Sequence, residues 1–325
     1  MPLWDTLAAL RVAIDGYAVR RREAPTPSGW TRVTTTVVLD GDGAAGEGED
    51  VTYDAAAHDD FPAELMLAGT WSLDDLSRRL DDFALEDYRR WAFESAALDL
   101  ALRQADASLG EVIGRPYRPV RFVASTRADV WPWLENDPGL EFKLDATKEW
   151  DAELMRRLAA LDRVRVVDLK AYYRGTRVDL EPDPDFYRAV AAAFPDVVIE
   201  DAWLEDGCLE ALAGAEDRLS FDAPIHSLAD VDALPVEPKW LNVKPSRFGT
   251  ARRLLECIET CLERGIRLYG GGQYELGEGR GQIQRLASLF YADGPNDVAP
   301  SVYNEGGARP GLPRSPLDVE GGPGL

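Results

Sequence analysis

Four short apolar runs in the middle of the chain each end in a charged residue, and this pattern constrains the fold more than any other feature. The runs are rich in Val, Ile and Leu, and the residues that end them are Asp168, Glu200, Asp222 and Lys244. Their spacings of 32, 22 and 22 residues match about one strand, one crossover helix and the connecting loops. Successive βα units are therefore predicted, and a parallel barrel would bring the ends of their strands to one mouth.

A single polar residue at a strand end usually marks only the point where solvent begins. Four in succession, each closing a buried run, favour a functional cavity instead. Carboxylates that are held together repel each other unless a cation lies among them, and hard oxygen ligands suit Mg²⁺. The pattern therefore favours a magnesium site at the predicted mouth.

Short strands alternate with helix-like segments between residues 119 and 272. Such alternation predicts right-handed βαβ units and an all-parallel sheet. Seven strands are expected in this range and an eighth near Val298–Val302, which favours a closed barrel over an open doubly wound sheet.

The part of the chain before residue 117 predicts strands first and helices later, an α+β order that can form a separate domain. Its expected elements are strands at 8–20 and 30–40, a turn rich in glycine and acid at 41–49, and helices at 59–67, 73–83 and 85–105.

The domain organisation follows from these patterns, since 325 residues are enough for a barrel and a smaller domain. We expect an α+β domain at 1–116, the barrel with its metal site at 117–304, and a tail rich in glycine and proline at 305–325. The tail is either disordered or packs on the first domain without regular structure.

The chain is strongly acidic, with 58 acidic and 36 basic residues and a net charge of −22. Such a surface repels phosphate backbones and anionic lipid, so no nucleic acid and no membrane partner is expected. No apolar run approaches the roughly 20 residues that span a bilayer, and the N-terminus lacks the basic leader of a signal peptide. Three cysteines are too few for a disulfide framework, so we predict a cytoplasmic protein that binds a small molecule and can form a homo-oligomer.

Lys244 is the strongest candidate for acid–base chemistry because it closes a strand at the predicted mouth. Beside a metal ion and away from water, its ammonium form is disfavoured, so its pKa is expected to fall towards neutrality. Three further residues at neighbouring strand ends can oppose it, namely Lys143, Asp145 and Lys170. Lys143 shares a strand face with Asp145, and Lys170 with Asp168, so structural ion pairs explain both lysines equally well.

Histidine and nucleotide chemistry have little support in the sequence. His58 lies in an acidic stretch and is expected at the surface, whereas His226 lies near the predicted mouth and is a candidate substrate contact. No G-x-S-x-G motif of a nucleophilic serine is present. The glycine-rich segment 270–281 fits neither a dinucleotide loop nor a P-loop, which argues against a nicotinamide-linked oxidoreductase. Its glycines instead predict a backbone close to the cavity, with Gln273 and Glu275 pointing in.

Three segments together resemble the enolase superfamily, and within it the muconate lactonizing enzyme subgroup. They are ESAALDLALRQA at 94–105, NVKPSRFG at 242–249 and GGGQYELGEGRG at 270–281. The resemblance covers nearly the whole chain and implies an α/β fold, a (β/α)7β barrel (a modified TIM barrel) with an N-terminal α+β capping domain. It also implies that Lys244 is an acid/base lysine and that three carboxylates bind Mg²⁺, namely Asp168, Glu200 and Asp222.

The sequence departs from the subgroup at strands two and three. Strand two of the subgroup carries K-x-K, and its second lysine is the other acid/base group. Here either Asp145 replaces that lysine or, with the strand shifted by two, Glu141 replaces the first lysine and Lys143 is catalytic. The Asp-x-Asn of strand three is Asp168-Leu-Lys170, which adds an ammonium group near the metal. Strand seven has no histidine, so the mandelate racemase arrangement is not expected.

The function that the resemblance implies is Mg²⁺-dependent removal of a proton α to a carboxylate, through an enediolate that the metal and lysines stabilise. The reaction would be that of a cycloisomerase, an o-succinylbenzoate-synthase-like dehydratase or an epimerase, acting on a small carboxylic acid. The alternative is a non-catalytic metal- or metabolite-binding barrel derived from such an enzyme. The segment Arg21–Gly29 is expected to cap the mouth, with Trp30 or Arg20 near the substrate.

Overall fold

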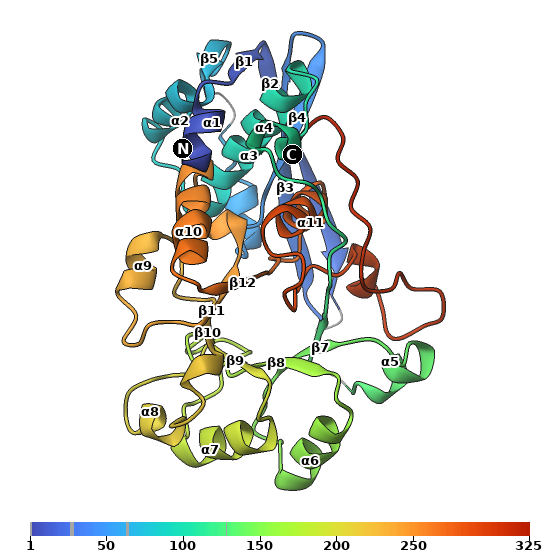
Figure 1. Cartoon of the computed structure of the whole chain (residues 1–325). Helices are drawn as coiled ribbons and strands as arrows, with labels where there is room; N and C mark the ends of the chain where they lie inside the picture. Colours follow the sequence, from blue (N-terminus) through green and yellow to red (C-terminus); the bar gives the residue numbers. More distant parts are fainter. Residues whose placement is uncertain (1, 27–28, 63–64, 128) are drawn as a thin grey trace.

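A curled, all-parallel sheet of seven strands forms the middle of the protein (Figure 1), in a computed structural model that describes residues 2–26, 29–62, 65–127 and 129–325. Its strand order is β12-β11-β10-β9-β8-β7-β6, so each βα unit adds beside the preceding one. This is the order of a (β/α) barrel, and the predicted fold class is confirmed. The strands are β6 (Ala124–Thr126), β7 (Phe142–Asp145), β8 (Val164–Asp168), β9 (Val198–Glu200), β10 (Leu219–Phe221), β11 (Trp240–Val243) and β12 (Arg267–Gly270).

A helix follows each strand of this sheet (Figure 1). Side chains cap several of these helices: the Asp151 carboxylate accepts the Leu154 N–H, and the Thr250 hydroxyl accepts the Arg253 N–H, which satisfies N–H groups that the helix itself leaves free. The helices are α5 (Trp131–Asn136), α6 (Ala152–Ala160), α7 (Pro184–Ala193), α8 (Cys208–Ala211), α9 (Leu228–Asp232), α10 (Ala251–Glu263) and α11 (Gly279–Phe290), with 3-10 turns η2 (Glu216–Arg218) and η3 (Pro245–Phe248).

Alternate residues of each strand point into the barrel and form layers there. Val166 of β8 and Val198 of β9 pack against the ring of Tyr269 from β12 in a buried apolar layer. Two residues further along the same strands come Asp168 and Glu200, on the same face. The apolar layer therefore closes the barrel directly beneath these acids.

An irregular segment, and not an eighth strand, joins the two edges of the sheet. The predicted strand at 298–302 is wrong, because this part of the chain is irregular and leads into a 3-10 turn, η4 (Ser301–Tyr303). Single β-bridges make the junction instead, and they pair Phe122 with Asn296 and Gly271 with Asp297.

The buried side chain of Asn296 completes this junction. Its Oδ1 accepts the Gly270 N–H of β12 at 2.6 Å, and its Nδ2 donates to the carbonyl of Arg121, next to β6, at 2.9 Å. One side chain thus satisfies backbone groups on both sides of the gap, where strand pairing would otherwise do so.

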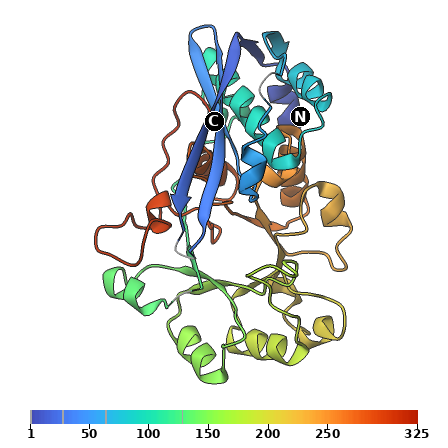
Figure 2. The same cartoon turned by 180° about the vertical axis from the view of Figure 1, so that it is seen from behind.

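The N-terminal region is α+β and packs beside the barrel (Figure 2). Its main sheet is antiparallel and consists of β2 (Gly16–Pro25), β3 (Thr31–Gly41) and β4 (Ala44–Asp50), with the long helix α3 (Asp87–Gln104) across it. Gly48 permits this close packing, because a Cβ there would lie 2.0 Å from the Ala92 carbonyl oxygen of α3. The smaller elements are α1 (Leu3–Ala8), β1 (Arg11–Ile14), η1 (Ala55–His58), β5 (Gly69–Ser72), α2 (Leu73–Asp81) and α4 (Leu109–Ile113).

Several local predictions for this region are wrong. Most of the expected turn at 41–49 is strand β4, since pairing with β3 outweighs the turn preference of its glycines. Most of the expected capping loop Arg21–Gly29 is likewise strand β2, and Pro27 and Ser28 lie outside the described residues. The described part of 59–67 is not helical. His58 is buried, because its two ring nitrogens bond to the Thr35 hydroxyl and the Thr52 carbonyl, each at 2.9 Å.

The C-terminal tail, residues 305–325, contacts both parts of the chain (dark red in Figure 1). Leu317 forms a β-bridge with Val120, and Gly324 with Ser108. The Leu325 N–H also donates to the carboxylate of Asp99 in α3 at 2.8 Å. These contacts fit a tail that packs without regular structure, and the domain boundaries at 116 and 304 stay predictions. Among the described residues, no helix is both long and apolar enough to cross a membrane.

We expect Asn296→Ala to lower the free energy of unfolding by about 2–5 kcal/mol, because buried N–H and C=O groups at the sheet junction lose their partner. The matched control is Asn136→Ala, which removes one local bond to the Pro132 carbonyl and should cost about 0.5 kcal/mol or less. Urea unfolding measures both. Equal midpoints for Asn296→Ala and the unchanged protein would show that Asn296 does not hold the junction.

Candidate active site

Three buried carboxylates meet where β8 and β9 end. Asp168 is the last residue of β8, Glu200 is the last residue of β9, and Asp201 follows Glu200. One carboxylate oxygen from each lies within 4.8 Å of the others, and all three residues are 0% exposed. Asp222, the third ligand implied by the resemblance, is not part of this group but adjoins it, since its backbone N–H donates to Asp201 Oδ1 at 2.8 Å.

Lysine ammonium groups neutralise the buried acids. Lys143 Nζ contacts Glu200 and lies 3.2 Å from Asp168, and Lys170 Nζ also contacts Asp168. Burial alone would raise the pKa of Asp168, but Lys170 and Lys143 hold that pKa well below its ordinary value. Burial also opposes the charge on Lys143, yet Glu200 and Asp168 raise its pKa well above the ordinary value.

Two carboxyl groups of the site are instead shifted towards the protonated form. Burial raises the pKa of Glu200, and burial together with the neighbouring Asp222 raises the pKa of Asp201 to about 7. Burial is the main cause of both shifts, and an additional cation at the site would favour the ionised form of these carboxyl groups.

Lys244 follows β11 and pairs with Asp222. Its Nζ lies 2.9 Å from Asp222 Oδ2, while Arg247 Nη1 lies 2.8 Å from Oδ1 and the Tyr173 hydroxyl donates to Oδ2 at 3.3 Å. Burial alone would lower the pKa of Lys244, but Asp222 outweighs it and the pKa is raised. The expected fall in this pKa beside a metal ion stays a prediction, and the strand pattern did not reveal so close a carboxylate partner.

The register of β7 separates the three candidates that can oppose Lys244. Asp145 pairs with Asp168 of β8, whereas Lys143 pairs with Val166 and so lies one layer deeper. The side chain of Lys143 is 1% exposed, against 11% for Lys170 and 16% for Asp145. Lys170, in the left-handed region at φ 52°, brings its Nζ to 3.2 Å from Asp145 Oδ1. The ammonium group nearest the end of β7 thus comes from the loop after β8.

Several residues that support this site were not predicted from the sequence. They are Asp201, Tyr173, Asn242, Arg247 and Tyr269. Arg247 lies in the NVKPSRFG motif and Asp201 follows a predicted ligand, so both carried a local signal. Tyr269 carried no local sequence signal, because it reaches Glu200 from across the barrel. Its hydroxyl donates to Glu200 and lies 2.9 Å from Ser220 Oγ.

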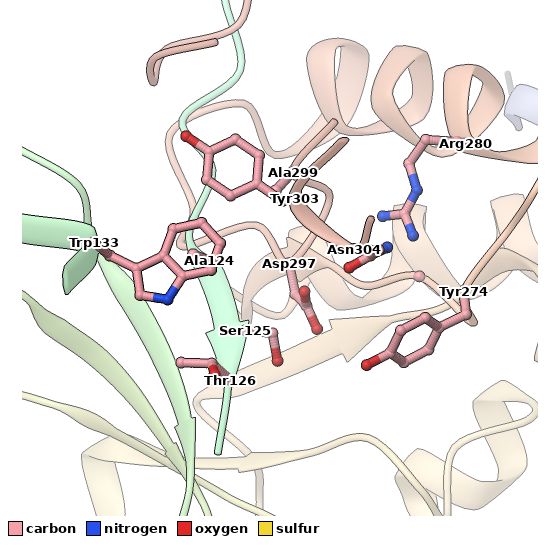
Figure 3. A pocket seen from close by; sticks show the side chains of 11 residues that line it. Ala124, Ser125, Thr126, Trp133, Tyr274, Arg280, Asp297, Ala299, Tyr303 and Asn304 are labelled. Carbon is pink, nitrogen blue, oxygen red and sulfur yellow. The ribbon is translucent and has the colours of Figure 1, made fainter. Parts of the chain in front are cut away.

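A pocket of about 520 Å³ opens at the mouth of the barrel (Figure 3). The stacked rings of Trp133 and Tyr303, with centroids 5.6 Å apart, form one wall. The carboxylate of Asp297 lies in the middle of the view and the guanidinium of Arg280 at one side. Its lining residues are Ala124, Ser125, Thr126, Trp133, Gly272, Tyr274, Arg280, Asp297, Ala299, Tyr303 and Asn304. Arg280 is the one cation among these described residues, which suits an anionic group.

The predicted substrate contacts lie near this pocket without lining it. Gln273 accepts the Tyr53 hydroxyl at 2.9 Å, and Glu275 pairs with Arg280 at 3.0 Å, so both polar groups already have protein partners. His226 is further away, with its Nδ1 3.4 Å from a carboxylate oxygen of Asp87 and nearly half of its side chain exposed. Substrate contact by these three residues stays a prediction.

The residues present fit a divalent cation. The acidic group offers hard oxygen donors close enough to share one ion, as Mg²⁺ requires. Asn242 adds a buried Oδ1 that lacks a hydrogen-bond partner among the described residues, while its Nδ2 donates to Glu200 at 3.2 Å. An unpaired oxygen beside the carboxylates is a further donor for such an ion.

Comparisons with known proteins agree with this geometry. The chain is 23% identical over 292 residues to o-succinylbenzoate synthase of Geobacillus stearothermophilus, covering 82% of this chain and 76% of that protein. It is similar in structure to muconate lactonizing enzyme of Pseudomonas fluorescens in complex with muconolactone (TM-score 0.73, 19% identity, 96% of this chain and 95% of that one). It is also similar to a dipeptide epimerase of Methylococcus capsulatus in complex with Mg (TM-score 0.72, 18% identity, 96% and 99%).

The chain shares its fold with members of the enolase superfamily, the fold that the sequence motifs led us to expect. The chain belongs to the family described as "Domain of unknown function (DUF8230)", whose N-terminal domain matches residues 5–112 and whose C-terminal domain matches residues 116–305.

We expect Tyr269→Phe to weaken Mg²⁺ binding about 10- to 100-fold, because Glu200 loses a hydroxyl that orients its carboxylate. Tyr291→Phe is the matched control, since Tyr291 is also buried but its hydroxyl has no hydrogen-bond partner among the described residues. Isothermal titration calorimetry measures both affinities. The same affinity in Tyr269→Phe as in the control would contradict the role of this hydroxyl.

Proposed function

We propose that this protein is a Mg²⁺-dependent enzyme that removes a proton α to the carboxylate of a small organic acid. The observation that carries the proposal is the group of three buried carboxylates with lysine ammonium groups against it at the mouth of a parallel barrel. A bound Mg²⁺ would supply the positive charge that stabilises the enediolate of the substrate. Asp168 and Glu200 would hold it, with Asp201 or Asp222 as the third ligand.

Lys170 and Lys244 are the proposed acid–base pair. The positive charge of a bound Mg²⁺ would oppose the effect of the carboxylates that raise the lysine pKa values, so that one lysine could lose its proton. As the neutral amine it accepts the α-proton, so that a C–H bond breaks and an N–H bond forms while the electron pair moves into the carboxylate. The second lysine, as ammonium, can return a proton to the carbon or to a leaving group. Tyr173 supports this pairing, because Lys170 Nζ lies 5.1 Å from the centre of its ring and its hydroxyl bonds to Asp222, the partner of Lys244.

Lys143 and Asp145 receive supporting roles. Lys143 is the most buried of the lysines and lies between Glu200 and Asp168, so it would hold the ligands in place and not reach the substrate. Asp145 would hold the ammonium group of Lys170 towards the mouth. In this proposal, the second lysine of strand two in the subgroup is replaced by a pair, Asp145 at the end of β7 and Lys170 in the loop after β8.

The pocket supports a substrate with a carboxylate, an apolar body and a second polar or anionic group. Trp133 and Tyr303 suit a flat or apolar body, and Arg280 suits an anion. The chemistry of the relatives points to cycloisomerisation, dehydration to an o-succinylbenzoate-like product, or epimerisation. Free, buried cysteines support a cytoplasmic location.

One observation favours a second candidate, a non-catalytic barrel that binds a metabolite. The ammonium group of Lys143 already contacts two of the proposed ligands, so lysine and metal compete for the same oxygens. In that case Mg²⁺ would bind weakly or not at all, and no small acid would exchange its α-proton.

We expect Lys244→Ala and Lys170→Ala each to slow deuterium exchange from D₂O into the α-position about 10²- to 10⁴-fold, with Mg²⁺ affinity nearly unchanged. The test acids are o-succinylbenzoate, muconolactone and dipeptides, followed by NMR with and without EDTA. Lys148→Ala, at a mostly exposed position paired only with Glu181, is the control and should exchange normally.

The outcomes separate the proposals. Exchange in both lysine variants at the control rate would remove this pair from the mechanism. Exchange lost in only one variant would identify the base of a one-base reaction. Weak or absent Mg²⁺ binding by the unchanged protein, without exchange of any acid, would favour the non-catalytic barrel.

A further inference from the structure

We propose that two charged residues of the N-terminal region, Arg32 and Glu49, are positioning residues for the substrate pocket. They hold the loop between β12 and α11 by its backbone. This inference deepens the proposed function and rests on it, because that loop contributes Gly272 and Tyr274 to the pocket and leads into α11, which contributes Arg280.

Glu49 binds the amide groups of the loop. It lies on β4 and is 1% exposed. Its carboxylate accepts the N–H groups of Leu276 at 2.7 Å, Gly277 at 3.0 Å and Gly279 at 3.1 Å. Gly279 is the first residue of α11, so the negative charge also faces the N-terminal end of a helix dipole. A buried carboxylate with several charge-assisted bonds holds these groups firmly.

Arg32 binds the carbonyl groups of the same loop. It lies on β3, is 0% exposed, and donates to the Gln273 carbonyl at 2.9 Å and the Tyr274 carbonyl at 3.3 Å. It also donates to the Thr52 carbonyl at 2.7 Å, so the guanidinium joins the N-terminal region to the loop. The Arg32 guanidinium thus binds carbonyl groups near the start of the loop, and the Glu49 carboxylate binds N–H groups near its end.

The loop conformation shows why such anchoring is required. Tyr274 has φ 55°, in the left-handed region that L residues rarely adopt and that persists only where the surroundings enforce it. Its ring lines the pocket (Figure 3), and Trp30 of the N-terminal region packs on it at 6.1 Å. The hydrogen bonds from Arg32 to residues 273 and 274 fix this conformation and therefore the direction of the Tyr274 side chain.

A glycine of the barrel, Gly279, allows the Glu49 carboxylate to approach the loop closely. A Cβ at Gly279 would lie 2.8 Å from Glu49 Oε2 and 3.0 Å from Glu275 Cγ, so this glycine lets the carboxylate reach the amides. At Gly281, two residues further into α11, the nearest group to a Cβ is Arg285 Nη1 at 4.0 Å. The two glycines therefore differ in whether an added methyl group disturbs the contact.

The experiment compares Glu49→Gln and Gly279→Ala with two controls. Glu47→Gln changes a carboxylate on the same face of β4 that pairs with Arg20 at the surface, and Gly281→Ala adds a methyl group where there is room. Hydrogen–deuterium exchange by mass spectrometry follows the backbone amides of 270–282. We expect both test variants to exchange at Leu276, Gly277 and Gly279 at least tenfold faster, and both controls to exchange like the unchanged protein.

Kinetics distinguish positioning from a merely structural role. With the acid that shows α-proton exchange, KM should rise at least tenfold in Glu49→Gln and Gly279→Ala while kcat changes less than threefold and Mg²⁺ affinity is unchanged. Unchanged amide exchange in the test variants would overturn the proposal, as would faster amide exchange with unchanged KM. Absence of α-proton exchange in the unchanged protein, with every acid, is instead the failure of the proposed function.

Discussion

Mutual repulsion among buried carboxylates is the constraint on which the rest of this structure depends. Asp168, Glu200, Asp201 and Asp222 lie at adjacent strand ends with almost no access to water. Two unit charges 4 Å apart interact by about 4 kcal/mol even at an effective dielectric constant of about 20, so such a group needs cations. The lysines at the site meet part of that need, while burial and the neighbouring Asp222 raise the pKa of Asp201 to about 7. An electrostatic deficit of this kind, at a site of hard oxygen donors, is what a divalent cation relieves.

The same constraint gives a physical meaning to the departures from the subgroup. Loss of a lysine at the end of strand two would leave more negative charge uncompensated, and removal of one partner from a buried ion pair costs about 3–5 kcal/mol. In the alignment that places Asp145 at the position of the second lysine, this acid increases the deficit, and Lys170 compensates from the loop after β8. In that alignment the two departures belong together, because one ammonium group has moved from strand two to the loop after strand three.

The sequence predicted the parts of the site that depend on strand ends, and it failed where contacts cross the barrel. The spacing of Asp168, Glu200 and Lys244 was enough to predict parallel strands with a common mouth, because each position is local to its own strand. Asp201 was missed because its carboxylate reaches the group only through a left-handed backbone at φ 53°. The eighth strand was wrong because Asn296 satisfies the sheet edges through its side chain, and no periodicity records such a contact.

The carboxylates and lysines of the proposed chemistry lie on different elements from the residues that line the pocket. The carboxylates and lysines are held by β7 to β11 and by the apolar layer beneath them, whereas the pocket is built from β6, the loop after β12 and the segment around Asp297. The N-terminal region holds the second group through backbone contacts to that loop. Under the proposed function, a barrel organised in this way can keep one proton-abstraction chemistry while its substrate changes, so the substrate is to be sought from the residues of the pocket and not from the acidic group.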